Sequence, residues 1–335
     1  MNGVEPMGPV VELAKDTDKL EILDVMDISF ASVQRSSSVR RDLDFWEWKY
    51  ISSPYGEASV HVIKLDGRVA AAGSLWPMMF QWQGRRLCAV QACDTVVHPD
   101  FRRRGLFGAL INARKSRAAE LDVDFIFNFP NANSLPGYMK AGWNFLGRVP
   151  WYVRVMNPVS LIRDRLNKGL SIAMDLPHHY CLTEAMADSL DASAIGDQGG
   201  LSIDRPAGYW RWRFCQRPNR QYGVICTEEP CESFAVFTLS RKPSGVIEMV
   251  VVDLIATRRS LSPLLRAILR CAREVGAAFV AMMNPQAFPS ATFYRHGFLP
   301  VREKNLVFLP VNPELPREIG EIGRWDLRAA IHDTI

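Results

Sequence analysis

The 335-residue sequence lacks the long apolar segments of a membrane protein. No apolar run approaches the ~18–20 residues that span a bilayer, and Met1–Pro9 has no basic stretch followed by an apolar core, the mark of a secretory signal. Charge of either sign is not in excess, since 40 basic and 36 acidic residues give a net charge of +4. This balance permits anionic ligands without indicating nucleic acid. We therefore expect a cytoplasmic protein with no membrane span and no nucleic-acid partner.

Cysteine is too irregularly spaced for a disulfide framework or a zinc site. The seven cysteines are odd in number and include no C-x-x-C pair, so we expect reduced thiols. His178, His179 and Cys181 could be imagined as metal ligands, but no second ligand cluster has metal spacing, and a surface turn is the commoner explanation. The sequence predicts no bound metal.

The most informative stretch of the sequence is Cys93–Gly108. Its β-branched run Thr95-Val96-Val97 predicts the end of a strand. His98-Pro99 then breaks the strand, because proline has no N–H for a ladder. Three arginines and a glycine lead into a predicted helix at 106–120, whose apolar residues recur at helical spacing.

This strand–turn–helix unit has the chemistry of an anion site. The N–H groups at the start of a helix are unpaired, and the helix dipole adds partial positive charge there. Gly105 lets the backbone approach a bulky ligand, and guanidinium groups suit phosphate oxygens. Those groups belong to Arg102, Arg103 and Arg104. An ordinary unit with a solvated basic turn would show the same local pattern.

The stretch resembles the pyrophosphate loop of the GNAT superfamily of CoA-dependent N-acyltransferases, R/Q-x-x-G-x-G/A. Arg102, Gly105 and Phe107 occupy its three key places. Phe107 departs from the usual small residue, although Gly108 follows it. About thirty residues later, Tyr138-Met139-Lys140-Ala141-Gly142-Trp143 resembles the family's Y-x-K-x-G-F box. Two signatures in the right order and spacing are more specific than either one.

The resemblance implies acyl-CoA as co-substrate, acetyl-CoA by default, and no metal. The sheet should part after the central strand, so that backbone groups of Val96 and Val97 pair with the pantetheine amides. Asparagine side chains after the next strand could bond the thioester or pantetheine, and Asn133 could cap the helix that follows. The predicted cofactor-binding residues are Thr95, Val96, Val97, Arg102, Arg103, Arg104, Gly105, Leu106, Phe107, Gly108, Asn128, Asn131, Asn133 and Tyr138.

Acylation of an amine needs a base for the amine proton and benefits from an acid for the departing thiolate. Tyr138 fits the acid role by its place in the box, with a packed aromatic as the alternative interpretation. Asp94 is the preferred base, because it immediately precedes the strand segment expected to meet pantetheine. Its recurrence as Asp253 in the second half would be explained equally well by a structural role. His98 is a weaker candidate.

The order of predicted elements matches the GNAT fold, an α/β architecture whose mixed, mostly antiparallel sheet is flanked by helices. A strand at 10–14 and an amphipathic helix at 20–30 come first. A meander follows, with hairpin turns at Asp66-Gly67 and Gln83-Gly84. The strand and helix around the loop, and a strand at 125–129, complete the unit.

The second half of the sequence repeats the first. Trp210-Arg211-Trp212-Arg213-Phe214 restates Trp46-Glu47-Trp48-Lys49-Tyr50, and Phe293–Phe298 echoes the box at Tyr138. A length suited to two domains agrees with this. The predicted division is an N-terminal catalytic domain at 1–158, a helical connector at 159–198 and a C-terminal domain at 199–335.

The two copies are not equally equipped. Ala256–Leu261 contains no glycine, and Phe293 stands in the place of Tyr138. Tyr294 is one residue off, which on a helix turns its hydroxyl by about 100°. We expect a degenerate second domain that builds a wall of the cleft or an interface.

These features predict an N-acyltransferase that moves an acyl group, acetyl by default, from CoA to a primary amine by direct attack in a ternary complex. The acceptor would be a small molecule, a sugar or a peptide. One alternative is transfer of longer acyl groups, from CoA or an acyl carrier protein, to a peptide or lipid precursor, with the apolar stretch Trp76–Trp82 as a tunnel lining. Another is a non-catalytic acyl-CoA-binding module.

Overall fold

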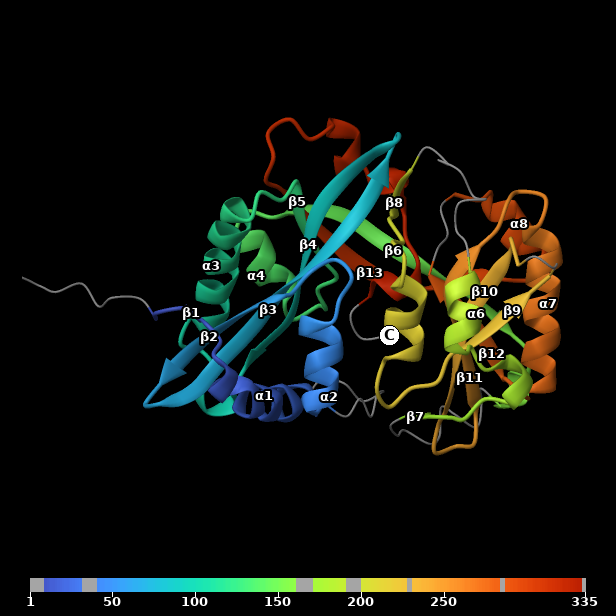
Figure 1. Ribbon diagram of the computed structural model, residues 1–335, viewed down its shortest axis with the longest axis horizontal. Coiled ribbons are helices and arrows are strands. Elements are labelled where there is room, and N and C mark those ends of the chain that lie inside the picture. Colours follow the sequence, from blue (N-terminus) through green and yellow to red (C-terminus); the bar gives the residue numbers. More distant parts are fainter. Residues whose placement is uncertain are drawn as a thin grey trace, which may run out of the picture.

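The computed structural model describes residues 9–31, 41–160, 171–190, 200–227, 231–283 and 287–332. Their strands join in one mixed sheet that runs through both halves of the chain (Figure 1). The predicted α/β class with a sheet flanked by helices is confirmed. Parts of the predicted connector lie outside the described residues.

The first half contributes six strands of the sheet and four helices to the described structure. The strands are β1 (Glu12–Leu13), β2 (Ser59–Leu65), β3 (Arg68–Trp82), β4 (Arg85–Val97), β5 (Phe125–Asn128) and β6 (Asn144–Val155). The helices are α1 (Lys19–Ala31), α2 (Leu43–Trp46), α3 (Leu106–Glu120) and α4 (Leu135–Lys140), with short helical turns η1 (Asp16–Asp18), η2 (Glu47–Ile51) and η3 (Pro99–Phe101).

The second half repeats this pattern less regularly. Its strands are β7 (Ile172–Ala173), β8 (Leu201–Ile203), β9 (Gly223–Cys226), β10 (Phe234–Arg241), β11 (Ile247–Ile255), β12 (Phe279–Met283), β13 (Leu299–Pro310) and β14 (Trp325–Asp326). Its helices are α6 (Glu184–Ser189), α7 (Leu261–Glu274) and α8 (Ser290–Arg295). Its short turns are η4 (His178–Tyr180), η6 (Arg211–Cys215), η7 (Arg317–Gly320), η8 (Ile322–Arg324) and η9 (Ala329–Ile331).

Locally encoded elements stand where the sequence predicts them. Helix α3 spans Leu106–Glu120. Both predicted hairpin turns have positive φ at their two central residues, 53° and 74° at Asp66 and Gly67, and 49° and 75° at Gln83 and Gly84. Such angles match the twist of the flanking strands. The arms β3 and β4 are therefore one long antiparallel pair.

The two halves exchange their last strands. The sheet order is β1-β2-β3-β4-β5-β13-β6-β12-β11-β10-β7. Strand β13 of the second half thus lies between β5 and β6 of the first, while β6 pairs with β12 of the second half. Strands from before and after residue 158 therefore pair in the same sheet. The domain boundaries stay a prediction from the sequence.

The repeated tryptophan motifs meet face to face. The indole Nε1–H of Trp48 donates to the carbonyl of Trp212 at 2.8 Å, and that of Trp212 donates to the carbonyl of Trp48 at 2.8 Å. Their rings are stacked with centroids 5.9 Å apart. The motif therefore recurs because each copy completes the other in the interface between the halves.

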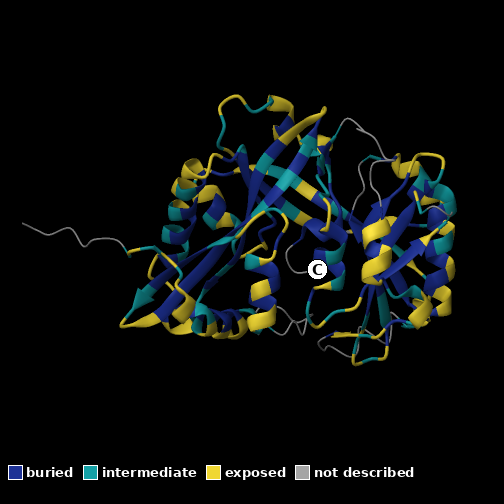
Figure 2. Ribbon diagram, viewed as in Figure 1, coloured by how far each residue is buried: buried dark blue, intermediate teal, exposed yellow. Residues whose placement is uncertain are grey.

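Burial follows the sheet, and the outward faces of the helices are exposed (Figure 2). One core lies under α1 and α2, and this side of β4 is called the α1/α2 face. A second core lies under α3 and α4 on the other side, the α3/α4 face. Among the described helices, none is long and apolar enough to cross a membrane.

The expectation of reduced thiols throughout is wrong at one place. Cys226 and Cys231 form a disulfide, with their Cα atoms 5.6 Å apart. They lie where β9 and β10 turn back on each other, and this antiparallel pairing, which sets Cys226 against Phe234, brings the two thiols together. An odd number of cysteines does not exclude one such local pair.

Candidate active site

The arginine-rich turn leads into a helix N-terminus that has no described side-chain cap. Gly105 is the N-cap of α3 with φ of +76°, and no described side chain caps the first turn. Arg103 also has a positive φ of 67°, while Arg102, Arg103 and Arg104 are all exposed. The N–H groups at Leu106, Phe107 and Gly108 therefore begin α3 among three guanidinium groups, the environment that favours an anion.

The sheet opens beside this turn. The parallel pairing of β4 with β5 joins Ala89 to Phe125, Val90 to Ile126 and Gln91 to Phe127. It extends no further among the described residues. β4 nevertheless continues to Val97, held on its other edge by β3.

At the opened segment, Val96 and Val97 lie opposite Ala72 and Ala71 of β3. The carbonyl of Val97 accepts Ser29 Oγ at 3.2 Å and Arg102 Nε at 3.5 Å. The predicted parting of the strands is present at the predicted place.

Tyr138 and Asn128 are brought together at the end of β5. Asn128 Nδ2 donates to Tyr138 Oη at 2.7 Å, and Asn128 Oδ1 accepts from the Phe129 N–H at 2.7 Å. The tyrosine ring is buried against Trp143 and Phe107, at centroid distances of 4.9 and 5.8 Å. Because the phenol oxygen accepts a hydrogen bond, its own proton can be donated to another group.

Phe107, the departure from the motif, is accommodated by a glycine on α4. A Cβ at Gly137 would collide with the Phe107 ring, so the absent side chain makes room for it. The bulky residue thus packs α3 against α4 and leaves the arginine turn exposed.

The other two asparagines lie in the turn before α4. Asn131 Oδ1 accepts from the N–H groups of Asn133 and Ser134, at 2.9 and 3.0 Å. The N-cap of α4 is Ser134, so the predicted cap at Asn133 is wrong, and Asn131 supplies the oxygen that orders the turn. Asn131 and Asn133 are exposed.

Asp94 is a buried ion-pair partner. It has φ of +49° where the register of β3 and β4 shifts, and it lies 2.6 Å from Lys49 Nζ and 2.8 Å from Tyr50 Oη. Burial raises the pKa of the carboxyl, but the adjacent Lys49 ammonium outweighs this and holds the pKa below its usual value. A lowered pKa makes a weaker base, and the base role stays a prediction.

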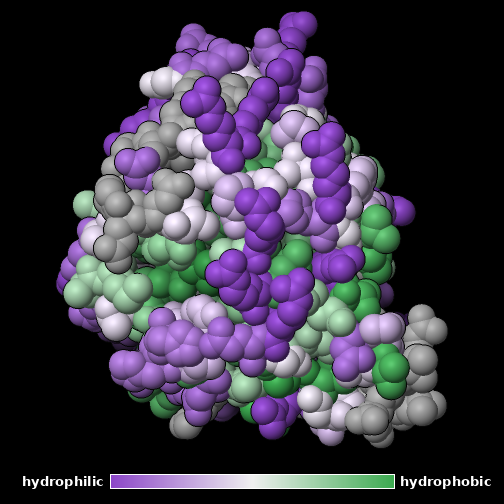
Figure 3. All heavy atoms as spheres, turned by 90° about the vertical axis from the view of Figure 1, so that its right-hand side faces the viewer, coloured by the Kyte–Doolittle hydropathy of each residue, from purple (hydrophilic) through white to green (hydrophobic). Residues whose placement is uncertain are grey.

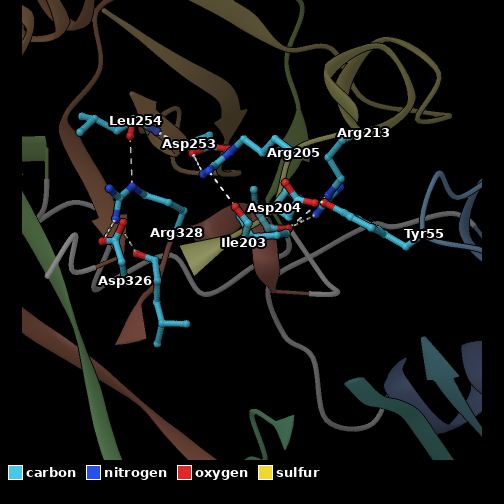
Figure 4. A network of polar contacts seen from close by, with 11 residues as sticks. Tyr55, Ile203, Asp204, Arg205, Arg213, Asp253, Leu254, Asp326 and Arg328 are labelled. Carbon is cyan, nitrogen blue, oxygen red and sulfur yellow. Dashed lines mark hydrogen bonds and ion pairs between the residues drawn. The ribbon is translucent and has the colours of Figure 1, made fainter. Parts of the chain in front are cut away.

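The second half buries its equivalent aspartate in the same way. Arg205 donates to both oxygens of Asp253, at 2.8 and 3.1 Å (Figure 4). In the same network Arg328 pairs with Asp326 and donates to the carbonyl of Leu254 at 3.1 Å. A structural role common to both copies therefore accounts for the recurrence of this residue.

Two contributions to the site escape the sequence patterns. Arg114 of α3 is buried and donates to the carbonyls of Ser74 and Cys93 and to Thr95 Oγ1, at 3.2, 3.3 and 2.7 Å. The Thr95 hydroxyl is thus engaged by the protein itself. In the sequence, the one signal for this role of Arg114 is its position on the face of α3 that meets the β3–β4 register shift.

The second contribution comes from the segment that contains Ala330 and His332. The His332 ring lies 5.3 Å from that of Phe129, directly after β5. Arg213 of η6 donates to the carbonyls of Ala330 and His332, at 2.9 and 3.3 Å. Burial lowers the pKa of His332 well below its usual value, and the charges of Lys304 and Lys49 add to this. No local pattern in the sequence places this segment beside the opening.

The corresponding turn of the second half contains no glycine and is held by hydrogen bonds between its own residues, while α7, like α3, has no described side-chain cap hydrogen bond. Ser260 Oγ accepts from the N–H of Thr257 at 2.9 Å, and the two hydroxyls lie 3.0 Å apart before α7. Phe293 is buried, while Tyr294 is 48% exposed. The face of this half seen in Figure 3 is mixed, with hydrophobic areas lying between hydrophilic side chains. Within the described residues, no group of three or more histidines, cysteines and acids could hold a metal ion.

Comparison with known proteins identifies the fold. Residues 11–146 match the family model of the acetyltransferase (GNAT) domain. No curated protein sequence matches the chain.

Solved structures match over nearly the whole chain. A GCN5-related N-acetyltransferase from Anabaena variabilis is 14% identical with a TM-score of 0.60, covering 90% of this chain and 73% of that one. A tandem GNAT protein from the clavulanic acid biosynthesis pathway is 14% identical with a TM-score of 0.55, covering 91% and 100%.

N-myristoyltransferase from Saccharomyces cerevisiae, solved with bound myristoyl-CoA, is 12% identical with a TM-score of 0.58, covering 90% and 84%. At such identities these likenesses show the fold alone, and the assignment of a GNAT domain to residues 11–146 rests on the match to the family model. Residues 11–146 therefore match a GNAT acetyltransferase domain, and the chain has a mixed α/β fold that it shares with a tandem GNAT protein.

Proposed function

We propose that the protein is an acyl-CoA-dependent N-acyltransferase whose donor site lies in its first half. The observation that carries this is the opening between β4 and β5 directly beside the uncapped N-terminus of α3. A diphosphate would bind the first-turn N–H groups and the arginines, and the pantetheine arm would lie along the free edge of β4 near Val97. The thioester would then reach the pair formed by Asn128 and Tyr138.

The reaction follows from this placement. The nitrogen of a neutral amine attacks the thioester carbonyl, so that a C–N bond forms and the C–S bond breaks. The amine loses one proton to a base or to water, and the CoA thiolate takes one proton from the Tyr138 hydroxyl. The products are an amide and free CoA.

A short acyl group fits the packing better than a long one. The apolar stretch Trp76–Trp82 is core: the ring centroid of Phe80 lies 5.3 and 5.5 Å from those of Phe125 and Phe127, and Trp76 and Trp82 are buried. Acetyl therefore remains the proposed group, and no specific observation favours the carrier-protein or binding-module alternatives.

Thiol release in the presence of primary amines tests the proposal. Acetyl-, octanoyl- and palmitoyl-CoA would each be offered with a panel containing amino alcohols, amino acids, an amino sugar and a lysine peptide. We expect amine-dependent release with acetyl-CoA. Tyr138→Phe should lower kcat by roughly 10²-fold while CoA affinity, measured by calorimetry, stays the same. Absence of both CoA binding and thiol release in the wild-type protein would contradict the proposal.

A further inference from the structure

One buried side chain at the opening of the sheet has no described partner. Gln91 lies in the last pair that joins β4 to β5, opposite Phe127. Its exposed fraction is 0%. Neither Nε2 nor Oε1 of its amide has a hydrogen-bond partner among the described residues.

Burial of an unpaired amide lowers the stability of the folded state. Both its donor and its acceptor lose their bonds to water on folding, and nothing described replaces them. An apolar residue of the same shape would avoid this cost. Such unpaired groups in a folded protein call for a binding partner that the free chain does not supply.

The side chain lies on the face opposite the proposed donor machinery. Along β4, Val90 and Ala92 belong to the core with Tyr138 on the α3/α4 face. Ala89 and Cys93 belong to the core on the α1/α2 face. Because successive side chains of a strand alternate, Gln91 points to the α1/α2 face.

The neighbour of Gln91 across the ladder supplies a second donor. Trp76 of β3 pairs with Gln91, it is 1% exposed, and its indole Nε1 also has no described partner. Phe127 lies on the other side, on β5. Two donor nitrogens and one carbonyl acceptor thus lie beside aromatic residues, at the last residue pair before the opening.

We propose that Gln91 binds the amine acceptor, an inference that rests on the proposed function. Its Oε1 accepts an N–H of the neutral amine, and Nε2, assisted by Trp76 Nε1, donates to an oxygen on the same molecule. A primary amide matches a molecule that presents a donor and an acceptor side by side. The acceptor class is therefore an amine with a neighbouring oxygen, the 2-amino alcohol fragment of amino alcohols and amino sugars.

The acceptor approaches from the α1/α2 face, while the thioester approaches from the α3/α4 face. Both amide atoms of Gln91 are closed to solvent, so binding involves a local opening of the aromatic side chains that cover them. The reacting nitrogen then lies at the point where β4 and β5 separate.

Gln91→Met tests the inference, because methionine keeps the length of the side chain and removes both polar atoms. Gln221→Met is the control for loss of a paired glutamine, since Gln221 is exposed and its side-chain oxygen accepts from the Leu176 N–H at 3.1 Å. The probes are ethanolamine and n-propylamine, which differ only in a hydroxyl group replaced by a methyl group. Melting temperature, CoA affinity, and kcat/KM for each amine would be measured for both variants and for the wild-type protein.

We expect wild type to prefer ethanolamine about tenfold, the worth of one hydrogen bond. Gln91→Met should lose this preference, keep its CoA affinity and melt about 2 °C higher. Gln221→Met should retain the preference and melt no higher than wild type. An unchanged preference in Gln91→Met, or a lower melting temperature, would overturn the inference. Wild-type protein that binds CoA yet uses neither amine would also overturn it, whereas failure to bind CoA would instead refute the proposed function.

Discussion

At the scale of single residues, the ion pair of Asp94 and Lys49 decides between a structural and a catalytic role. Both side chains are buried, at 4% and 1% exposure, and their charged atoms are 2.6 Å apart. Removing one member of a buried pair leaves the other charge without compensation. The stability of a variant therefore reports the structural role separately from turnover.

Asp94→Asn should lower the free energy of unfolding by roughly 3–5 kcal/mol, as measured by denaturant titration. Adding Lys49→Met to the same chain should restore part of this loss, because the buried ammonium that has lost the Asp94 carboxylate is then gone. A variant that keeps its stability but loses turnover would instead establish Asp94 as the base.

His61 predicts a loss of stability in mild acid. Burial, with the charges of Arg114 and Arg117, lowers the pKa of His61 to about 4. Between an unfolded pKa near 6.5 and about 4, the unfolded chain binds a proton that the folded chain does not, so stability falls as pH falls. The loss should reach up to about 3 kcal/mol near pH 4.

His61→Gln should flatten this dependence, as measured by denaturant titration between pH 4 and 8. His178→Gln, at an exposed histidine, is the control and should leave the dependence unchanged. An identical pH dependence in His61→Gln and wild type would show that the imidazole is protonated equally in both states.

At the scale of elements, what could be predicted was local. The positive φ of the turn at Gly67 and the N-terminus of α3 at Gly105 are determined by the residues that form them. The partner of Asp94 was not predictable, because Lys49 lies 45 positions away and nothing near Asp94 indicates it. The sequence predicts Asn133 as the helix cap, whereas Asn131 is the residue whose side chain orders the turn before α4. Two asparagines in one loop cannot be told apart by residue type.

The contact between α3 and α4 gives a prediction at this scale. Gly137→Ala places a methyl group where the Phe107 ring lies, and overpacking of this kind should cost about 1–3 kcal/mol. Adding Phe107→Ala should relieve the collision, although it removes apolar contact with Tyr138. Gly108→Ala is the control, because a Cβ there meets nothing within 4 Å. Equal stability of Gly137→Ala and wild type would contradict this packing.

At the scale of the whole molecule, the exchange of β6 and β13 is the feature that the sequence did not reveal. A repeated motif shows that two copies exist, but the pairing of β5 with β13 depends on contacts about 180 residues apart. The alternation of residues within a strand does not indicate which distant strand will pair with it. The reciprocal hydrogen bonds of Trp48 and Trp212 join the halves in the same way.

The chain should therefore unfold as one unit. Calorimetry is expected to show a single transition, and residues 1–158 expressed alone should not fold, because β5 and β6 would lack β13 between them. A cooperatively folded fragment, or two separate transitions in the intact chain, would refute the dependence of each half on the other.

The central claim is that a CoA diphosphate binds at the mouth of α3 in the first half and not at the matching turn of the second. Amide hydrogen exchange with and without CoA tests this most directly. We expect slower exchange across residues 96–108 and no change across 256–262. Protection confined to 256–262, or CoA binding with no change at 96–108, would contradict the account.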